Sequence, residues 1–227
     1  MCYIRVFLLG ITLILSVPVK GQENLTGFWQ PQMALDYEVT PTYGHNFSVA
    51  YRSFFLEEEN FNLRSRQLDV VHFSKFVLKD NQNIALGIQY RFRDIFESAS
   101  NELRLTQQYN FTYRPITIRY GHRFRTEQRI TTDVTTYRFR YRFTLDFPLK
   151  GQKLDLGEPY FAGSAEQLLS VANGESSQYD FRLNGQIGWQ FDKGLKLQMG
   201  IEYRFEEYTA AQLQHVVFLL TTVQLSL

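Results

Sequence analysis

Residues 137–143 alternate strictly between aromatic and arginine side chains, reading Tyr-Arg-Phe-Arg-Tyr-Arg-Phe. On a β-strand, successive side chains point to opposite faces, so one face would carry three guanidinium groups and the other four aromatic rings. Such a strand needs polar surroundings on one side and apolar surroundings on the other. A chain built from many such strands is therefore restricted to folds that keep these two environments apart.

The same alternation recurs in the segments 84–93, 103–114, 116–125, 137–147, 179–191 and 195–205. The first face of these segments has 35 positions, and none of them carries a formal charge when histidine is neutral. The second face holds arginines at 91, 93, 104, 114, 119, 123, 125, 138, 140, 142, 182 and 204, with Lys196 and the acids Asp146, Asp180 and Glu202. The pattern predicts an all-β fold, a single antiparallel transmembrane β-barrel with an aromatic and aliphatic exterior toward lipid and an arginine-rich lumen.

The N-terminus has the pattern of a secretory signal peptide. Arg5 precedes an apolar stretch over 6–17, and the small residues around 19–21 form a cleavage site. We therefore expect a signal peptide at 1–21 and a mature barrel at 22–227. The apolar stretch is shorter than the about 20 residues that a membrane-spanning helix needs. The sequence thus predicts export, with the cell outer membrane as destination.

Loss of the signal peptide would change the composition. Arg5 and Lys20 are two of the 24 basic residues, so 22 basic and 23 acidic side chains would remain, a net charge of −1. This balance argues against a nucleic-acid partner. The only cysteine, Cys2, would leave as well, which excludes disulfides and cysteine-ligated zinc from the mature chain.

Turn signals divide the chain into eleven candidate strands at 27–39, 44–55, 66–78, 83–93, 102–114, 116–127, 134–147, 158–170, 178–191, 194–205 and 213–226. Bacterial single-chain barrels have even strand numbers. We therefore favour twelve strands, with ten as the alternative in which 66–78 or 158–170 is not a full strand. The last segment, which ends at Leu227, is similar to the C-terminal assembly signal of outer-membrane barrels and implies the barrel-assembly machinery and outer-membrane lipid as partners.

Several blocks resemble the domain-of-unknown-function (DUF) 2490 family. They are Asn-Glu-Leu-Arg at 101–104, Arg-Tyr-Gly-His-Arg-Phe-Arg-Thr-Glu-Gln-Arg at 119–129, and the alternating segment 137–143 followed by Asp-Phe-Pro-Leu at 146–149. Members of that family are expected to be outer-membrane barrels of Gram-negative bacteria. The resemblance implies a fold and a location but no activity.

Arginines on one face of so many strands cannot point to lipid, where each would cost about 2–4 kcal/mol at the bilayer midplane. Glu102, Glu127, Glu158 and Glu166 are the acids expected to pair with them. The wall could be a structural network, or a narrow pore for small anionic or sugar solutes. The residues expected to line the lumen are Arg91, Arg104, Arg119, Arg123, Arg125, Glu127, Arg138, Arg140, Arg142, Asp146, Glu166, Arg182, Glu202 and Arg204.

Two alternatives remain open. The spacing of His72 and Ser74 resembles that of outer-membrane lipid-modifying hydrolases, but Ile84 lies near the position where an orienting acid is needed, so we favour a protein that is not an enzyme. The other alternative is a soluble exported β-barrel binding protein with its faces reversed. His122 has no second ligand at metal spacing, and we predict no metal, cofactor or catalytic residue.

Overall fold

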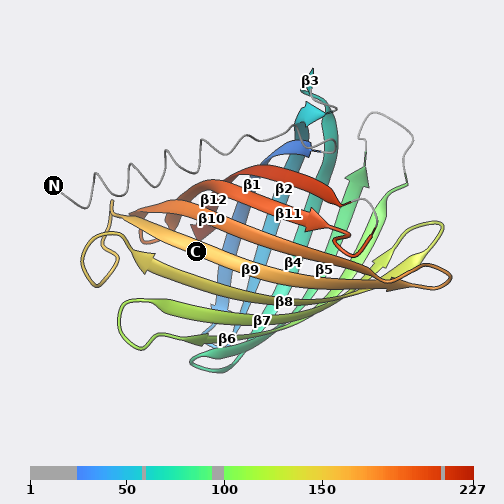
Figure 1. Cartoon of the computed structure of the whole chain (residues 1–227). Coiled ribbons are helices and arrows are strands. Elements are labelled where there is room, and N and C mark those ends of the chain that lie inside the picture. Colours follow the sequence, from blue (N-terminus) through green and yellow to red (C-terminus); the bar gives the residue numbers. More distant parts are fainter. Residues whose placement is uncertain (1–24, 58–59, 94–99, 211–212) are drawn as a thin grey trace.

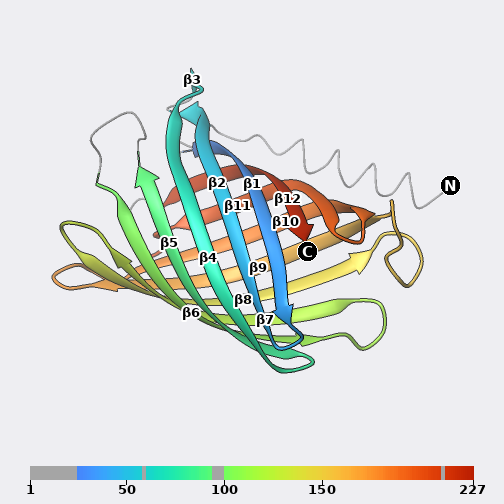
Figure 2. The ribbon, with the colours of Figure 1, turned by 180° about the vertical axis from the view of Figure 1, so that it is seen from behind.

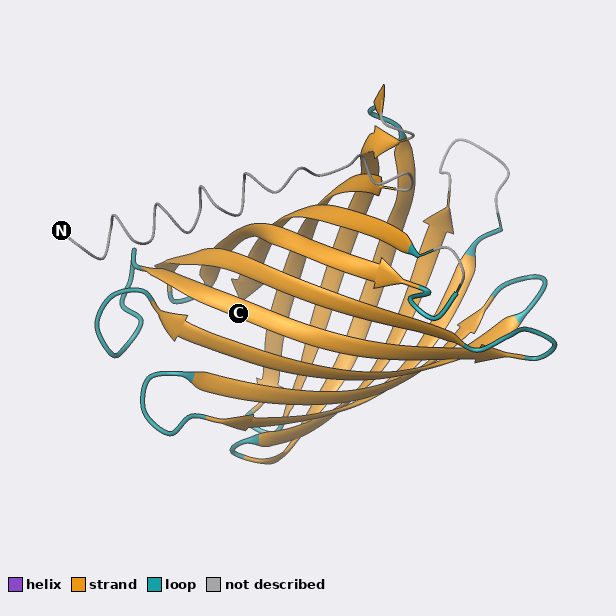
Figure 3. Ribbon diagram, in the orientation of Figure 1, coloured by secondary structure: helices purple, strands orange, loops and turns teal. Residues whose placement is uncertain are grey.

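The structure, a computed structural model, describes residues 25–57, 60–93, 100–210 and 213–227. The expected signal peptide lies outside these ranges. The described residues form strands and loops (Figure 3). None of them belongs to a helix long and apolar enough to cross a bilayer.

In the described ranges, twelve strands follow one another along the chain (Figure 1). Their bounds are β1 (Leu25–Thr40), β2 (Tyr43–Glu57), β3 (Asn60–Phe61), β4 (Ser65–Lys79), β5 (Gln82–Arg93), β6 (Glu102–Tyr113), β7 (Arg119–Ile130), β8 (Thr135–Pro148), β9 (Pro159–Ala172), β10 (Gln178–Asp192), β11 (Leu195–Glu206) and β12 (Gln214–Ser226). All except β3 form the wall of a barrel. The two-residue β3 pairs only with the end of β2.

The wall closes through a parallel pair. Each wall strand from β1 to β12 is antiparallel to the next one along the chain, but β1 and β12, which complete the ring, run in the same direction, with Leu25 opposite His215 and Asp36 opposite Ser226. Figure 2 shows β1 beside β12 from behind. A ring of eleven strands cannot be antiparallel throughout, because alternating directions close only when the number is even. The expectation of a purely antiparallel barrel is corrected at this seam.

The eleven segments expected from the sequence correspond to the eleven wall strands. The largest difference is at β7, which was expected at 116–127 and runs from Arg119 to Ile130. Pro115 and the residues up to Ile118 form a connection instead, and Ile116, expected on the apolar face, is 80% exposed there. Apolar character at Ile116 and Ile118 extended the alternation beyond the true start of the strand.

The apolar face of the wall points outward. Phe139 and Tyr141 on β8 are 49% and 39% exposed, whereas the side chain of Arg140 between them is 8% exposed. The same division holds on β5, where Leu86, Ile88 and Tyr90 are exposed and Arg91 is buried. The arrangement with apolar side chains inside is therefore not the one that this chain adopts.

The barrel has two different rims. At the C-terminal rim, where β12 ends, β1–β2, β4–β5 and β10–β11 are joined by two-residue turns, and longer connections span 114–118 and 149–158. At the opposite rim, longer connections span 131–134 and 173–177, and the described residues 207–210 lie there as well. Most of the buried side chains lie in the half of the interior near this opposite rim, among them Phe28, Glu102 and Phe218.

Candidate functional site: a basic chamber inside the barrel

Glu102 organises the first group of ion pairs inside the wall. Its side chain is 1% exposed and accepts hydrogen bonds from Arg129 Nε at 3.1 Å and Nη2 at 2.8 Å. Arg93 Nη2 donates to it at 2.5 Å, and Arg104 Nε also donates to it. One carboxylate thus receives three guanidinium groups from β5, β6 and β7. Charge-assisted contacts of this kind hold the three strands in one arrangement near the opposite rim.

Arg140 joins two further carboxylates across the interior. Its Nη1 donates to Glu127 at 2.6 Å and its Nη2 donates to Glu166 at 2.6 Å. Glu166 also accepts from Arg142, at 2.9 Å from Nε and 3.1 Å from Nη2, and Glu127 accepts from Arg125 at 3.4 Å. The acids are almost fully enclosed, so each needs these donors to offset the loss of water.

Smaller pairs continue the network around the ring. Asp69 on β4 accepts two hydrogen bonds of 2.7 Å from Arg91 on β5. Glu202 accepts from Arg204 at 2.6 Å. Asp180 lies at the edge of ion-pair distance, 3.9 Å from Arg138 and 4.0 Å from Arg182.

An aromatic plug fills the interior near the opposite rim, where β1, β2 and β12 meet. We define the plug as Phe28, Phe54, Val216 and Phe218, which form one buried cluster. The ring of Phe218 is 0% exposed and lies 5.1 Å from that of Phe28. Arg204 lies 3.7 Å from the centroid of Phe218, so the plug is joined to the ionic network through a cation–π contact.

A cavity of about 600 Å³, here called the chamber, occupies the middle of the barrel. Its charged lining residues, taken from the described part of the chain, are Arg52, Lys75, Arg91, Arg104, Arg123, Arg125, Arg140, Arg142, Arg182 and Arg204 against the two acids Asp69 and Glu202. Several of these arginines face one another directly in the sheet register, as in Arg123 with Arg142 and Arg182 with Arg204. The chamber is therefore strongly basic, although the whole chain has a formal charge of only +1.

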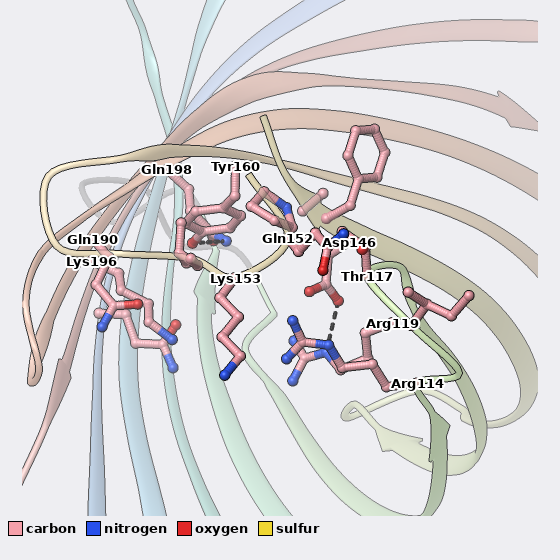
Figure 4. Close-up of a pocket in the computed structure, with 16 residues that line it drawn as sticks. Arg114, Thr117, Arg119, Asp146, Gln152, Lys153, Tyr160, Gln190, Lys196 and Gln198 are labelled. Carbon is pink, nitrogen blue, oxygen red and sulfur yellow. Dashed lines mark hydrogen bonds and ion pairs between the residues drawn. The ribbon is translucent and has the colours of Figure 1, made fainter. Parts of the chain in front are cut away.

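A second cavity of about 720 Å³, here called the vestibule, lies at the C-terminal rim. Its lining carries the basic residues Arg114, Arg119, Lys153 and Lys196 and one acid, Asp146 (Figure 4). Arg119 Nε donates to Asp146 at 2.8 Å, and Gln198 donates to the hydroxyl of Tyr160 at 2.8 Å. Basic residues therefore outnumber acids at this rim as well as in the chamber.

The residues expected to line the lumen divide into three groups. Nine line the chamber, namely Arg91, Arg104, Arg123, Arg125, Arg140, Arg142, Arg182, Glu202 and Arg204. Arg119 and Asp146 line the vestibule. Glu127, Arg138 and Glu166 belong to the buried ionic network.

Sequence reasoning did not assign several residues of the interior. Arg129 belongs to the Glu102 group but lies beyond the strand end expected at 127. Asp69 lies on the doubtful segment 66–78, and Arg52 lies next to a β-bulge that disturbs the alternation of β2. Glu158, expected to pair with arginines, instead lies in the 149–158 connection, where its carboxylate accepts from the backbone of Asp155.

The histidines lie on the outer face of the wall and contact aromatic or histidine rings. His45 Nδ1 lies 3.0 Å from His72 Nε2, and His122 Nδ1 lies 2.9 Å from the hydroxyl of Tyr141. Ser74 is 3.5 Å from the hydroxyl of Tyr43, and within the described ranges no hydrogen bond joins it to His72.

Within the part of the chain that the structure describes, no group of three or more His, Cys, Asp or Glu side chains is placed to hold a metal.

Comparisons with known proteins identify a family but no activity. Comparison with curated proteins and with solved structures gives no match. Residues 26–215 match the model of a family described as protein of unknown function, DUF2490, and the chain belongs to this family.

Proposed function

We infer that the protein is a β-barrel of the Gram-negative outer membrane whose basic interior takes up small anionic solutes through the C-terminal rim. The observation that carries this proposal is the inside-out wall, with Phe139 49% exposed outside and the side chain of Arg140 8% exposed inside. Large contiguous apolar surfaces are rare on proteins that remain in water and mark contact with a membrane or a partner. Lipid around the barrel would cover this surface on every side.

The dimensions of the wall support a membrane location. The shortest wall strands have 12 residues. At about 3.3 Å per residue and a tilt of about 45°, such a strand rises about 28 Å, close to the apolar band of about 25 Å in outer-membrane barrels. Aromatic residues also lie at both ends of the outer face, with Tyr90 and Phe92 near the opposite rim and Trp189 and Phe191 near the C-terminal rim. Such belts are typical of strands that cross two headgroup regions.

The rims suggest an orientation. Outer-membrane barrels have short turns on the periplasmic side and longer connections outside the cell. The C-terminal rim has the two-residue turns, so we assign it to the periplasm. In this orientation the vestibule opens toward the periplasm, and the plug and the Glu102 group lie toward the cell exterior.

The interior favours anions and restricts their passage. Basic residues line both the vestibule and the chamber, and enclosed charge of one sign selects for solutes of the other. The buried plug and the ionic network occupy the half near the opposite rim. We therefore expect a small conductance with anion selectivity rather than the large currents of an open porin.

Two experiments test this function. Fractionation of cells should place the protein in the outer membrane and require detergent for its release. Recovery in the soluble periplasm without detergent contradicts the membrane assignment. In planar bilayers, the reversal potential under a salt gradient should show anion preference, which Arg125→Gln weakens and Lys150→Gln, an exposed control on the 149–158 connection, leaves unchanged. Cation preference contradicts the solute assignment, and a silent barrel favours a structural role.

A further inference from the structure

Arg123 has no hydrogen-bonded acid of its own among the described residues, and Glu166, the acid that attracts it, is bound by Arg140 and Arg142. The register partner of Arg123 on β8 is another arginine, Arg142. On its own strand, Arg125 donates to Gln108 and Glu127. Within the described ranges, no hydrogen bond or ion pair reaches the guanidinium of Arg123, which lines the chamber. Like charges directly opposite in a sheet are destabilising, so this position is suited to an anion that the chain itself does not supply.

Amide side chains form much of the remaining lining. They are Gln30, Gln32, Asn46, Asn83, Gln89, Gln108, Asn110, Asn184 and Gln186. Most of those near Arg123 are occupied with one another, since Gln108 donates to Asn110 at 3.0 Å and Asn110 donates to Asn83 at 2.6 Å. The carbonyl oxygen Oε1 of Gln186 is different, because it is buried and no described residue donates to it. An unused acceptor in a polar chamber is suited to a hydroxyl donor.

The size of the chamber suits a small organic anion better than a bare inorganic ion. Its volume of about 600 Å³ lies in the range of about 300–1,000 Å³ found for sites of small organic ligands. A bare phosphate ion would leave most of this volume and most of the amides unused. The wall closes around the chamber, so the ligand has to be a solute that enters from a rim and not a lipid with acyl chains.

Small residues line the inner face between the vestibule and the chamber, and neighbouring side chains fill the space beside them, namely the ring of Tyr160 at Gly188, the hydroxyl of Thr144 at Gly121 and the side chain of Gln186 at Gly200. The inward positions at this level are Gly121 on β7, Thr144 on β8, Gly188 on β10 and Gly200 on β11. Long side chains flank this level on both sides, and the basic vestibule would concentrate anions in front of it.

We propose that the chamber binds a hydroxylated organic anion of the sugar phosphate or sugar acid class, with its anionic group on Arg123 beside Arg142 and its hydroxyls on the amides. This inference names the solute class of the proposed function and rests on that function only for the route of entry. Guanidinium forks bind phosphate and carboxylate groups through paired hydrogen bonds. Amides bind hydroxyl groups as both donors and acceptors.

Isothermal titration calorimetry on the purified full chain in detergent tests the proposal, with glucose 6-phosphate, gluconate, glucose and inorganic phosphate as probes. Glucose 6-phosphate or gluconate should bind at least tenfold more tightly than glucose and than phosphate. Arg123→Gln should weaken that binding at least tenfold, and Arg123→Lys should recover part of it. Arg64→Gln, at the opposite rim and paired with Glu57, is the matched control and should bind like the unaltered chain.

Three results overturn the proposal: no binding of any probe, binding of glucose or phosphate as tight as that of glucose 6-phosphate and gluconate, or unchanged affinity in Arg123→Gln. Fractionation and bilayer selectivity do not depend on these titrations. A failure of the ligand assignment is therefore distinguishable from a failure of the membrane function.

Discussion

Replacement of Glu102 by glutamine tests whether the ionic network stabilises the barrel. The substitution keeps the shape of the side chain and removes the charge that Arg93, Arg104 and Arg129 share. Removing one partner of a buried ion pair leaves the other charge uncompensated and costs about 3–5 kcal/mol. The side chains of Arg104 and Arg129 are 8% and 17% exposed, whereas that of Arg93 is 31% exposed and can turn toward water. We therefore expect the two enclosed arginines to account for most of the loss.

Urea unfolding in lipid vesicles measures this loss through the fluorescence of Trp29 and Trp189, the two tryptophans of the chain. With a denaturant slope of about 2–3 kcal/mol per molar, a loss of about 3–5 kcal/mol lowers the unfolding midpoint by about 1–2.5 M. Glu175→Gln is the matched control, because Glu175 is exposed in the 173–177 connection. Surface changes of this kind usually alter stability by less than about 0.5 kcal/mol.

A double substitution separates loss of the network from general damage to the wall. The double variant Glu102→Gln with Arg104→Met also removes a guanidinium that Glu102→Gln alone leaves unpaired. The stability losses of the two single variants should therefore not add, and the double variant should recover part of the stability that Glu102→Gln loses. If Glu102→Gln unfolds at the same urea concentration as Glu175→Gln, the three arginine contacts contribute nothing measurable. The account of the interior as a stabilising network is then refuted.

The remaining predictions concern the plug, the seam and the rims. Phe218→Ala should raise the single-channel conductance in planar bilayers, because Phe218 is a fully buried member of the plug; an unchanged current would show that the plug does not limit passage. Cysteines placed at Met33 and Val223, which face each other across the parallel seam, should form a disulfide under mild oxidation. As a control, a cysteine four positions further along β12 should not pair with the cysteine at Met33, because it lies about 13 Å away along the strand. In whole cells, a membrane-impermeant maleimide should label Ser176→Cys and should label Lys193→Cys only after the outer membrane is opened; the reverse result inverts the orientation.

The faces of the strands could be predicted because their chemistry is extreme. Alternation at 137–143 specifies which residues share a face once the strand exists. Which face points inward depends on the surroundings of the barrel, so the arrangement with reversed faces stayed open until the structure placed the arginines inside. The start of β7 was predicted three residues early, because Ile116 and Ile118 continue the alternation into a connection and nothing local marks where pairing with β6 begins.

The pairings inside the lumen could not be predicted from the sequence. Glu102 lies opposite Arg91 in the sheet register, yet its ion pairs are with Arg93, Arg104 and Arg129. Long arginine side chains reach two positions along a strand, so several partners are sterically possible for each acid. Which pair forms depends on the curvature of the whole wall. The plug was missed for another reason: Phe28 and Phe218 are apolar residues on the inner face, and on these two strands alternation does not separate the faces.

The strand number shows why a local pattern cannot specify closure. Each segment of the sequence predicts a strand and its faces, but the direction in which the last strand meets the first is a property of the complete ring. The number of strands in a barrel must be even only when every neighbouring pair is antiparallel. A short turn makes consecutive strands antiparallel, but no turn connects β1 to β12, so these two strands can pair in parallel and close a ring of eleven. Parallel pairing is slightly less stable per residue than antiparallel pairing. The plug packs directly against this seam through Phe28 and Phe218, so aromatic packing inside the barrel adds to the backbone pairing at the position where the ring closes.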